Sequence, residues 1–411
     1  MSDFDTMIYD ACVIGAGASG LVSAAALARR GLHTILIDQN KKSGRKLYAT
    51  GNGRCNLANA VLSDSAYYAD AFARAVVNDA SRQEMLSMLE EIGIPVTDRQ
   101  GYLYPKSLQA SSVVWALTDA ARLAGVEFLY DSKAVSVKPG RDGKNAGDSE
   151  AWEVVTEGKT SHSIRTARVI LAMGSPAARE LGAAEEGEIY SLFQQLSLPY
   201  QPFGPALCPV ETEEDLSSLA GVRVRCSMKL LHAGAVFEEN GEAQFTEYGI
   251  SGIVTFNLAT MAGKGDSMIL DLLPEWGSVE EVLYFLRKVV QARSAYGAFN
   301  GLLHEKLCLY ALEMHCPGKG KQSLSEWSDQ ELSETIRSLK FMSLRVRGLR
   351  GEQGQACKGG VSTSVLDPLT MQVKGQPTLA VTGETTDVVG RCGGYNLMYA
   401  MISGLRAGRN L

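Results

Sequence analysis

The feature that most constrains this chain is a glycine-rich turn between a short apolar run and an alanine-rich segment. Residues 8–14 form the apolar run, and the pattern Gly-x-Gly-x-x-Gly follows at 15–20. Apolar residues then recur with helical spacing up to two arginines and a glycine at 29–31. Basic residues followed by glycine are typical of a helix C-terminus. A second apolar run, 34–37, closes on Asp38. This order predicts a strand, a helix and a second strand parallel to the first.

Each glycine of the turn has a physical role in binding a dinucleotide. Gly15 allows the tight turn, Gly17 lets the backbone approach a pyrophosphate, and Gly20 lets the helix pack closely on the strand. The helix N-terminus favours the negative charge of the phosphates. Asp38 lies 38 − 15 = 23 residues after Gly15, where a carboxylate accepts hydrogen bonds from both hydroxyls of an adenosine ribose. This part of the pattern does not distinguish NAD from FAD. The predicted dinucleotide-binding residues of this segment are Gly15, Ala16, Gly17, Ala18, Ser19, Gly20, Asp38 and Gln39.

Further motifs extend along the chain. They are Gly44-Arg45-Lys46, Gly51-x-Gly53-Arg54-Cys55-Asn56, Tyr104-Pro105-x-Ser107, Gly383-Glu384-x-x-Asp387 and Gly393-Gly394-Tyr395-Asn396. With these motifs the chain resembles the HI0933-like family of bacterial NAD(P)/FAD-dependent oxidoreductases, in the two-dinucleotide-binding flavoprotein superfamily. The resemblance covers essentially the whole chain and implies that the dinucleotide is FAD.

The loop after Asp38 has the chemistry expected of a segment that wraps a flavin. Two cations, Arg45 and Lys46, lie just past the ribose-binding acid, where they can offset phosphate charge. The Gly-Asn-Gly turn at 51–53 permits positive φ and close backbone approach to a flat ring. Asn56 both donates and accepts hydrogen bonds, as a flavin edge does. The alternative is a solvated basic loop. The predicted cofactor-binding residues of this loop are Arg45, Lys46, Asn52, Gly53, Arg54, Cys55 and Asn56.

The resemblance places three later segments at the cofactor. It implies that the backbone at Val135 contacts the adenine, although an ordinary sheet valine is an equal alternative. It also implies that the chain passes the flavin near residues 172–174 and that Glu384 binds the ribityl chain. A final helix beginning near Gly394 would point its N-terminus at the pyrimidine side of the flavin. The alternative there is an amphipathic helix after a loop. The remaining predicted cofactor-binding residues are Val135, Ala172, Gly174, Gly383, Glu384, Gly394 and Asn396.

The expected fold is α/β, with an interrupted Rossmann-like FAD-binding domain, βαβ with a three-layer sheet. We expect this domain at 1–195 and 345–411, because the motifs lie at both ends of the chain. Alternation with turns predicts an antiparallel barrel or sandwich at 196–275, including a strand at 250–258. Helical periodicity predicts a helical subdomain at 276–344. The segment 241–254 resembles a family stretch, and it is equally well a packing turn or a substrate contact.

Composition and charge indicate which partners, metal sites and cellular location to expect. Lys plus Arg number 40 and Asp plus Glu 46, so the net charge is 40 − 46 = −6, which disfavours a nucleic-acid partner. The basic run Arg345, Arg347, Arg350 with Lys358 is the local exception. Eight scattered cysteines form no C-x-x-C pair, and the histidines show no metal spacing, so we expect no metal site. We expect a cytoplasmic protein without a membrane segment.

The resemblance implies a reductase in which NADH or NADPH reduces FAD and the flavin passes hydride to an organic acceptor. No second Gly-x-Gly-x-x-Gly follows a strand, so the nicotinamide would dock transiently. Family members suggest an apolar small molecule such as an unsaturated steroid or bile-acid ketone. Tyr395, Tyr48 and Tyr104 are candidate proton donors, beside solvent. The alternative functions are a flavin-dependent RNA-modifying protein and a flavin-binding protein without turnover.

Overall fold

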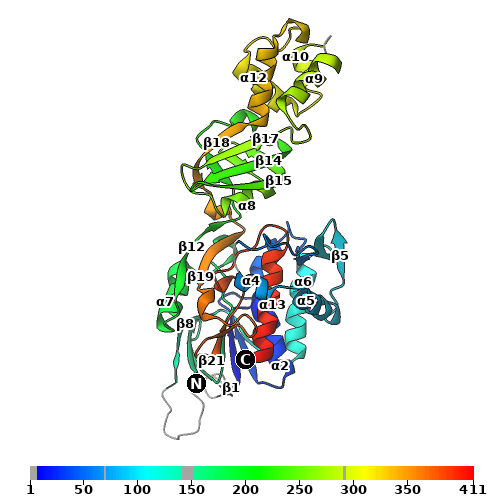
Figure 1. Cartoon of the computed structure of the whole chain (residues 1–411). Helices are drawn as coiled ribbons and strands as arrows, with labels where there is room; N and C mark the ends of the chain where they lie inside the picture. Colours follow the sequence, from blue (N-terminus) through cyan, green and yellow to red (C-terminus); the bar gives the residue numbers. More distant parts are fainter. Residues whose placement is uncertain (1–6, 69–70, 141–151, 290–292) are drawn as a thin grey trace. The chain divides into compact units, whose positions relative to one another are not determined.

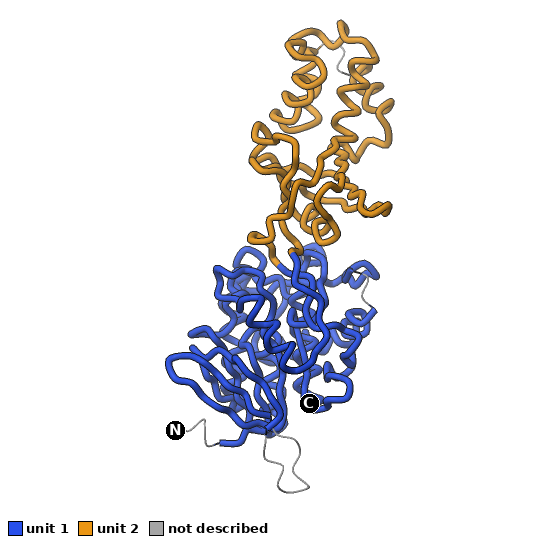
Figure 2. The backbone as a smooth tube through the Cα atoms, turned by 90° about the vertical axis from the view of Figure 1, so that its left-hand side faces the viewer, with its two compact units in different colours: residues 1–204, 356–411 blue, residues 205–355 orange. Residues whose placement is uncertain are grey.

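The computed structural model describes residues 7–68, 71–140, 152–289 and 293–411. The chain divides into two compact units, shown in different colours in Figure 2. Unit 1 comprises residues 1–204 and 356–411, and unit 2 comprises residues 205–355. The chain therefore leaves unit 1 after residue 204 and returns at residue 356, later in both cases than the expected 195 and 345.

A largely parallel sheet is the centre of unit 1. Its strand order is β20 (Gln372–Val373), β21 (Gln376–Val381), β11 (Val169–Leu171), β2 (Ala11–Ile14), β3 (Thr34–Ile37) and β7 (Glu127–Leu129). Only β20 is antiparallel to its neighbour. Every residue of β2, β3 and β11 is buried, as the continuous apolar runs of a sheet covered on both faces require.

Helices cover one face of this sheet (Figure 1). They include α2 (Ala18–Arg29), α5 (Asp79–Glu91), α6 (Ala110–Leu123) and α13 (Tyr395–Asn410). The packing of α13 on α2 depends on glycine, because a Cβ on Gly404 would lie 2.4 Å from the carbonyl oxygen of Ser19. A Cβ on Gly408 would lie 2.6 Å from the carbonyl oxygen of Ser23. The last helix and the first helix of the Rossmann motif therefore meet backbone to backbone.

The other face of the sheet is covered by a four-stranded sheet, which gives the three layers (Figure 1). Its order is β1 (Ile8–Tyr9), β10 (His162–Thr166), β9 (Trp152–Gly158) and β8 (Ser132–Pro139), with α7 (Glu186–Gln195) packed on β8. Smaller elements of unit 1 are α3 (Arg45–Ala49), α4 (Ala71–Val76) and the sheet of β4 (Ala58–Asn59), β6 (Tyr102–Pro105) and β5 (Val96–Arg99). A further pair joins β19 (Ala356–Val361) to β12 (Tyr200–Ala206), whose last two residues already belong to unit 2.

Unit 2 contains a closed six-stranded antiparallel barrel. Its order is β13 (Val210–Thr212), β16 (Gly249–Ser251), β15 (Ala235–Thr246), β14 (Arg223–His232), β17 (Ser267–Asp271) and β18 (Met342–Leu349). Pairing of β13 with β18 closes the barrel and leaves no unpaired edge. Because β18 comes after the helices in the sequence, the expected boundary at 344–345 falls inside a barrel strand. The prediction of an α/β fold with a Rossmann-like domain, a β insert and helices is confirmed.

The helices of unit 2 share a core with the barrel. They are α8 (Ile253–Ala259), α9 (Val279–Val289), α10 (Ala295–Phe299), α11 (Glu305–His315) and α12 (Asp329–Lys340). One buried apolar cluster includes barrel residues such as Met268 and Leu270 together with Leu332 and Ile336 of α12. The residues expected to form a separate helical subdomain thus pack into the same core as the barrel.

The expected strand at 250–258 is wrong beyond its first residues. The strand β16 ends at Ser251, and Gly252 takes a φ of 98°. A Cβ there would lie 2.6 Å from the carbonyl oxygen of Glu242, so the chain turns at a point where β15 passes closely. The helix α8 follows, because its Val254 and Leu258 fill the barrel core one helical turn apart. Tertiary packing here overrides the strand preference of β-branched residues.

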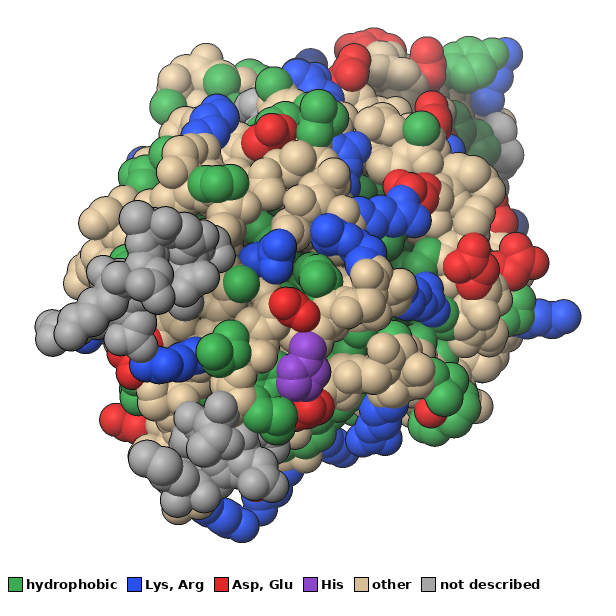
Figure 3. Space-filling view, turned by 90° about the horizontal axis from the view of Figure 1, so that it is seen from below, with side chains coloured by type: hydrophobic (Ala, Val, Ile, Leu, Met, Phe, Trp, Pro, Cys, Tyr) green, Lys and Arg blue, Asp and Glu red, His purple; other side chains and the backbone are tan. Residues whose placement is uncertain are grey.

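The face of the molecule seen from below in Figure 3 carries basic, acidic and hydrophobic side chains side by side. In unit 1, two arginines make polar contacts at the C-terminal ends of α2 and α13. Arg30 Nη1 donates to the carbonyl oxygen of Gly408 at 2.9 Å, and Arg409 pairs with Glu84. Cations there offset the partial negative charge of a helix end.

Among the described residues, no helix combines the length and the apolar character needed to cross a bilayer.

We predict that Gly404→Ala destabilises unit 1 by about 1–3 kcal/mol, because the added methyl group overpacks the contact between α13 and α2. Gly187→Ala is the matched control, since a Cβ at Gly187 in α7 meets no atom within 4 Å. Denaturant unfolding followed by circular dichroism measures both. Equal stability of the two variants would show that the contact does not constrain the fold.

Candidate functional site

Four loops that follow neighbouring parallel strands meet at one edge of the unit 1 sheet. β2 leads into the glycine turn, β3 into Asp38, β11 into residues 172–175, and β21 into the short 3-10 helix η6 (Gly383–Thr385). β2 pairs in parallel with both β3 and β11, and β11 pairs in parallel with β21. Their carboxyl ends therefore share an edge, where open α/β sheets bind ligands. Predicted residues from both ends of the sequence are brought together here.

The three glycines of the turn differ in what surrounds them. A Cβ on Gly15 would lie 2.3 Å from the carbonyl oxygen of Ala172, and one on Gly20 would lie 1.8 Å from that of Gly15. These two glycines are required by packing within the chain. By contrast, a Cβ on Gly17 would meet nothing within 4 Å. Gly17 therefore leaves open space beside the start of α2.

The N-terminus of α2 has no counter-charge of its own. Its N-cap, Gly17, provides no side-chain hydrogen bond, and the first turn contains no acidic residue. The first N–H groups of a helix lack partners within the helix and carry partial positive charge. Together with the open space at Gly17, these donors fit a pyrophosphate.

Asp38 is held rigidly beside this turn. Its Oδ2 accepts a hydrogen bond from the Ala16 N–H at 2.7 Å, and its Oδ1 accepts from the Asn40 N–H at 2.7 Å. Burial raises the pKa of the Asp38 carboxyl, and these hydrogen bonds act against that rise. Neighbouring Gln39 donates from Nε2 to the carbonyl oxygen of Gly182 at 2.9 Å. The carboxylate is thus fixed next to the glycine turn. Its Oδ1 also accepts from Asn40 Nδ2 at 3.0 Å, so Oδ2 is the oxygen that retains a lone pair for a ligand hydroxyl.

A polar cluster joins the C-terminal loop to α3. Lys46 Nζ lies 2.6 Å from Glu384 Oε2, and the Ser175 hydroxyl donates to the same oxygen at 3.1 Å. The Lys46 and Glu384 side chains are only 30% and 20% exposed. Lys46 was expected to offset phosphate charge, but its charge is balanced by Glu384 in this structure. Arg45, expected beside it, donates from Nη1 to Asn40 Oδ1 at 3.1 Å.

The loop 51–56 has the backbone freedom that its sequence predicts. φ is positive at Gly51, Asn52, Gly53 and Cys55. The carbonyl oxygen of Gly53 accepts from the Ala110 N–H at 2.8 Å, which ties the loop to the start of α6. Residues 51–54, including Arg54, are exposed, Cys55 is buried and Asn56 is partly buried. Burial raises the pKa of the Cys55 thiol to about 11, so this thiol is protonated at neutral pH.

The start of α13 is anchored by close backbone packing. Gly394 takes a φ of 92°, and a Cβ there would lie 2.5 Å from the carbonyl oxygen of Ala58. The Asn396 amide accepts from the Gly390 N–H at 2.7 Å and donates to the Gly390 carbonyl at 2.9 Å. Asn396, predicted to bind the cofactor, therefore uses its side chain to close the loop 390–396.

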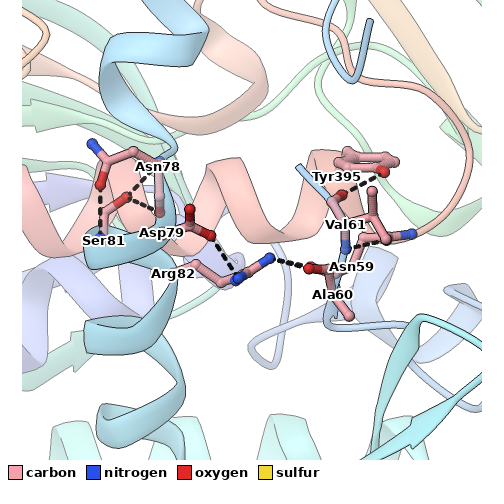
Figure 4. Close-up of polar contacts among 8 residues, drawn as sticks. All are labelled: Asn59, Ala60, Val61, Asn78, Asp79, Ser81, Arg82 and Tyr395. Carbon is pink, nitrogen blue, oxygen red and sulfur yellow. Dashed lines mark hydrogen bonds and ion pairs between the residues drawn. The ribbon is translucent and has the colours of Figure 1, made fainter. Parts of the chain in front are cut away.

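The three candidate proton donors lie in different surroundings. The Tyr395 hydroxyl donates to the Val61 carbonyl at 2.8 Å (Figure 4). Two residues earlier in the chain, the Asn59 carbonyl accepts a hydrogen bond from Arg82 Nη1 at 3.3 Å. Burial raises the pKa of Tyr395, and its proton is engaged by the backbone. Tyr48 is 38% exposed, with Lys42 Nζ 5.0 Å from its ring centroid. Tyr104 is partly buried in β6.

Sequence reasoning missed three polar residues at this edge. Ser175 binds Glu384, Thr385 Oγ1 accepts from the Gly174 N–H at 2.9 Å, and Asn40 donates to Asp38. Each directly follows a predicted residue, which is the only sequence signal they offer. Val135 lies at a bulge of β8, where its carbonyl accepts from Gln195 Nε2 at 3.2 Å. In the described parts of the chain, no three His, Cys, Asp or Glu side chains are placed to hold a metal ion.

The fold and this edge define a dinucleotide-binding protein of the Rossmann type. The family model for the HI0933-like protein Rossmann domain matches residues 9–410, and the chain belongs to this family. Its class is that of the flavoprotein oxidoreductases.

Two relatives span nearly the whole chain. A 3-dehydro-bile acid delta(4,6)-reductase of Clostridium scindens is 32% identical and covers 97% of each chain. A ribosomal RNA dihydrouridine synthase of Escherichia coli is 27% identical and covers 98% of each chain. Among solved structures, a flavocytochrome c3 fumarate reductase in an open conformation aligns with a TM-score of 0.50 and 15% identity. That alignment covers 98% of this chain and 78% of the other, and it shows the shared fold.

We predict that Lys46→Met and Glu384→Gln each destabilise unit 1 by about 1–2 kcal/mol, because each leaves a partly buried polar partner unpaired. The double variant should lose less than the sum of the two single losses. Denaturant unfolding of the four proteins gives the coupling energy. A coupling energy of zero would mean that the ion pair contributes nothing to the site.

Proposed function

We propose that this protein binds FAD at the strand edge of unit 1 and reduces a carbon–carbon double bond conjugated to a carbonyl, using NADH or NADPH. The observation that carries this proposal is the 32% identity, over 97% of both chains, to a reductase of an unsaturated bile acid. The open space at Gly17 and the uncapped start of α2 support a bound pyrophosphate. Without a second glycine fingerprint in the sequence, the nicotinamide binds only transiently.

Different residues of the edge would bind different parts of the cofactor. The start of α2 would hold the pyrophosphate, and Asp38 the adenosine ribose. Glu384 and Lys46 would lie along the ribityl chain, where Glu384 can accept a hydroxyl hydrogen bond while it keeps its partner. The start of α13 would favour negative charge on the pyrimidine side of the ring. When bound, FAD supplies the hydride-accepting and hydride-donating centre.

The substrate that this proposal implies is an apolar unsaturated ketone, such as a 3-oxo-Δ4 steroid or bile acid. Hydride adds to the β-carbon, and a proton must then reach the α-carbon. Because the Tyr395 hydroxyl already donates to the Val61 carbonyl, solvent, Tyr48 and Tyr104 are the stronger candidate donors.

A second candidate is reduction of a uracil base in RNA, favoured by the 27% identity to a ribosomal RNA dihydrouridine synthase. The chemistry is related, since the double bond of uracil is also conjugated to a carbonyl. The basic run offers limited support, because Arg347 and Arg350 both pair with Glu211, at 3.3 and 3.0 Å. We therefore rank RNA below a small molecule.

We predict that Gly17→Val weakens FAD binding by at least about tenfold, because the side chain fills the space proposed for the pyrophosphate. The apo-protein should lose less than about 1 kcal/mol of stability, the size of an N-cap effect. Fluorescence titration of the apo-protein with FAD measures affinity, and thermal unfolding measures stability. Unchanged FAD affinity would place the cofactor elsewhere.

The activity is tested in two anaerobic half-reactions. NADH or NADPH should bleach the flavin absorbance of the purified protein, and a 3-oxo-Δ4 steroid should restore it. Unmodified ribosomal RNA is the parallel acceptor, with dihydrouridine measured by mass spectrometry. Restoration by RNA and not by the steroid would favour the second candidate. A flavin that neither nucleotide bleaches would contradict the proposed reductase and support a flavin-binding protein without turnover.

A further inference from the structure

A surface pocket lies in unit 2, in the part that includes α9. Its volume is about 480 Å³, which is in the range of small-molecule sites. It is lined by three aromatic side chains and two carboxylates: Trp276, Tyr284, Phe285, Glu280 and Glu281. None of these residues belongs to the strand edge of unit 1, and nothing in the proposed reaction uses them.

Helical periodicity creates one side of this pocket. Val279, Val282 and Leu286 of α9 are buried in the unit 2 core. The four lining residues of α9 have the spacing i, i+1, i+4 and i+5, so they form a strip on another face of the helix. Tyr284 is 60% exposed although it is a large aromatic residue. The helix thus carries two exposed carboxylates on one turn and, on the next, exposed Tyr284 beside partly buried Phe285.

Trp276 is fixed in place by a buried lysine. Lys340, only 3% exposed, directs Nζ to Asp271 Oδ2 at 2.8 Å and to the carbonyl oxygens of Leu273 and Trp276 at 2.9 and 2.7 Å. All three of its N–H donors are therefore used to hold the segment 271–276. This anchoring presets the wall that carries the indole ring.

Two further contacts join that segment to α9. The Trp276 and Phe285 rings pack with their centroids 5.0 Å apart and tilted by 51°. The Gly277 N–H donates to Glu281 Oε2 at 2.9 Å, which orients the carboxylate. The rings and the carboxylate are thus preorganised before any ligand arrives, which reduces the entropy lost on binding.

The chemistry of this lining favours a cation with apolar substituents. Aromatic faces attract ammonium groups, most strongly when several rings surround them, and carboxylates add charge complementarity. Lys288 Nζ lies 4.7 Å from the Tyr284 ring centroid, so this ring already has one cation over it. Hydrogen bonds from its own N–H and from Ser278 lower the pKa of Glu280, with a smaller effect of the Arg337 charge, so it is ionised at neutral pH. The nearby cations Lys288 and Arg337 temper the negative field, which favours a weakly hydrated methylated cation over a metal ion.

We propose that this pocket of α9 and Trp276 binds a small organic cation with a methylated ammonium group. Its binding energy comes from the three rings, and the carboxylates select the charged ligand over a neutral one of the same shape. This site is independent of the FAD site and does not depend on the proposed reduction.

Choline is the probe, and its uncharged isostere 3,3-dimethylbutan-1-ol tests the role of charge. Both are titrated into the full-length protein by calorimetry, with and without FAD. We expect saturable choline binding at millimolar or lower concentration and at least about tenfold weaker binding of the isostere. Equal binding of the two ligands, or no choline binding below about 10 mM, would overturn the proposal.

Two variants locate the site. Trp276→Ala and Tyr284→Ala should each weaken choline binding by about tenfold or more. Trp115→Ala is the matched control, since Trp115 of unit 1 is 68% exposed and lies outside the pocket. Tyr284 is largely exposed, so its removal keeps the test valid if Trp276→Ala lowers the melting temperature. Choline affinity in Tyr284→Ala equal to that of the control would place any binding elsewhere.

Discussion

Main-chain pairing of β11 with β2 on one side and β21 on the other is the constraint on which unit 1 depends. Leu171 pairs with Ile14 and with Val381, so three strand ends align at one edge. All of unit 2 lies between β11 and β21 in the sequence. The entropic cost of closing a loop rises only slowly with its length, and a segment that folds by itself holds its own ends together. The sheet can therefore accommodate a whole second unit in one connection.

The glycines at this edge have two kinds of role: some are required for close packing, and one leaves space proposed for a ligand. At Gly15, Gly20 and Gly404 a side chain would collide with main chain, so these residues serve the approach of two helices and a strand. At Gly17 the same substitution meets no protein atom. One short motif thus contains both structural and binding requirements, which is why its variants can separate folding from cofactor affinity.

Whereas the apolar run 8–14 divides into β1 and β2, which belong to different sheets, local patterns allowed α2, β3 and the last strand and helix to be predicted closely. Their spacing, stop signals and glycines are written in neighbouring residues. The strand expected at 250–258 was wrong beyond Ser251, because burial of Val254 and Leu258 in a barrel formed by distant strands selected a helix. The barrel strand β18 was missed since it follows the helices in the sequence.

In the site, too, local sequence identified individual residues, whereas their contacts depend on distant parts of the chain. The sequence selected Lys46 and Glu384 separately, but their pairing requires the register of β21 against β11. Asn396 was chosen for its amide, whose geometry toward Gly390 depends on the loop path. The ligand contacts of all these residues stay predictions.

The interrupted layout of unit 1 also has a consequence for biosynthesis. A ribosome emits the complete stretch 205–355 before β21 and α13 exist. Domains generally fold as units while the chain grows, so the barrel and its helices can form while the nucleotide-binding half still lacks a sheet strand and the helix that covers α2. Until translation reaches the final helix, the nascent Rossmann half exposes apolar surface, and this is the interval in which chaperones would protect it.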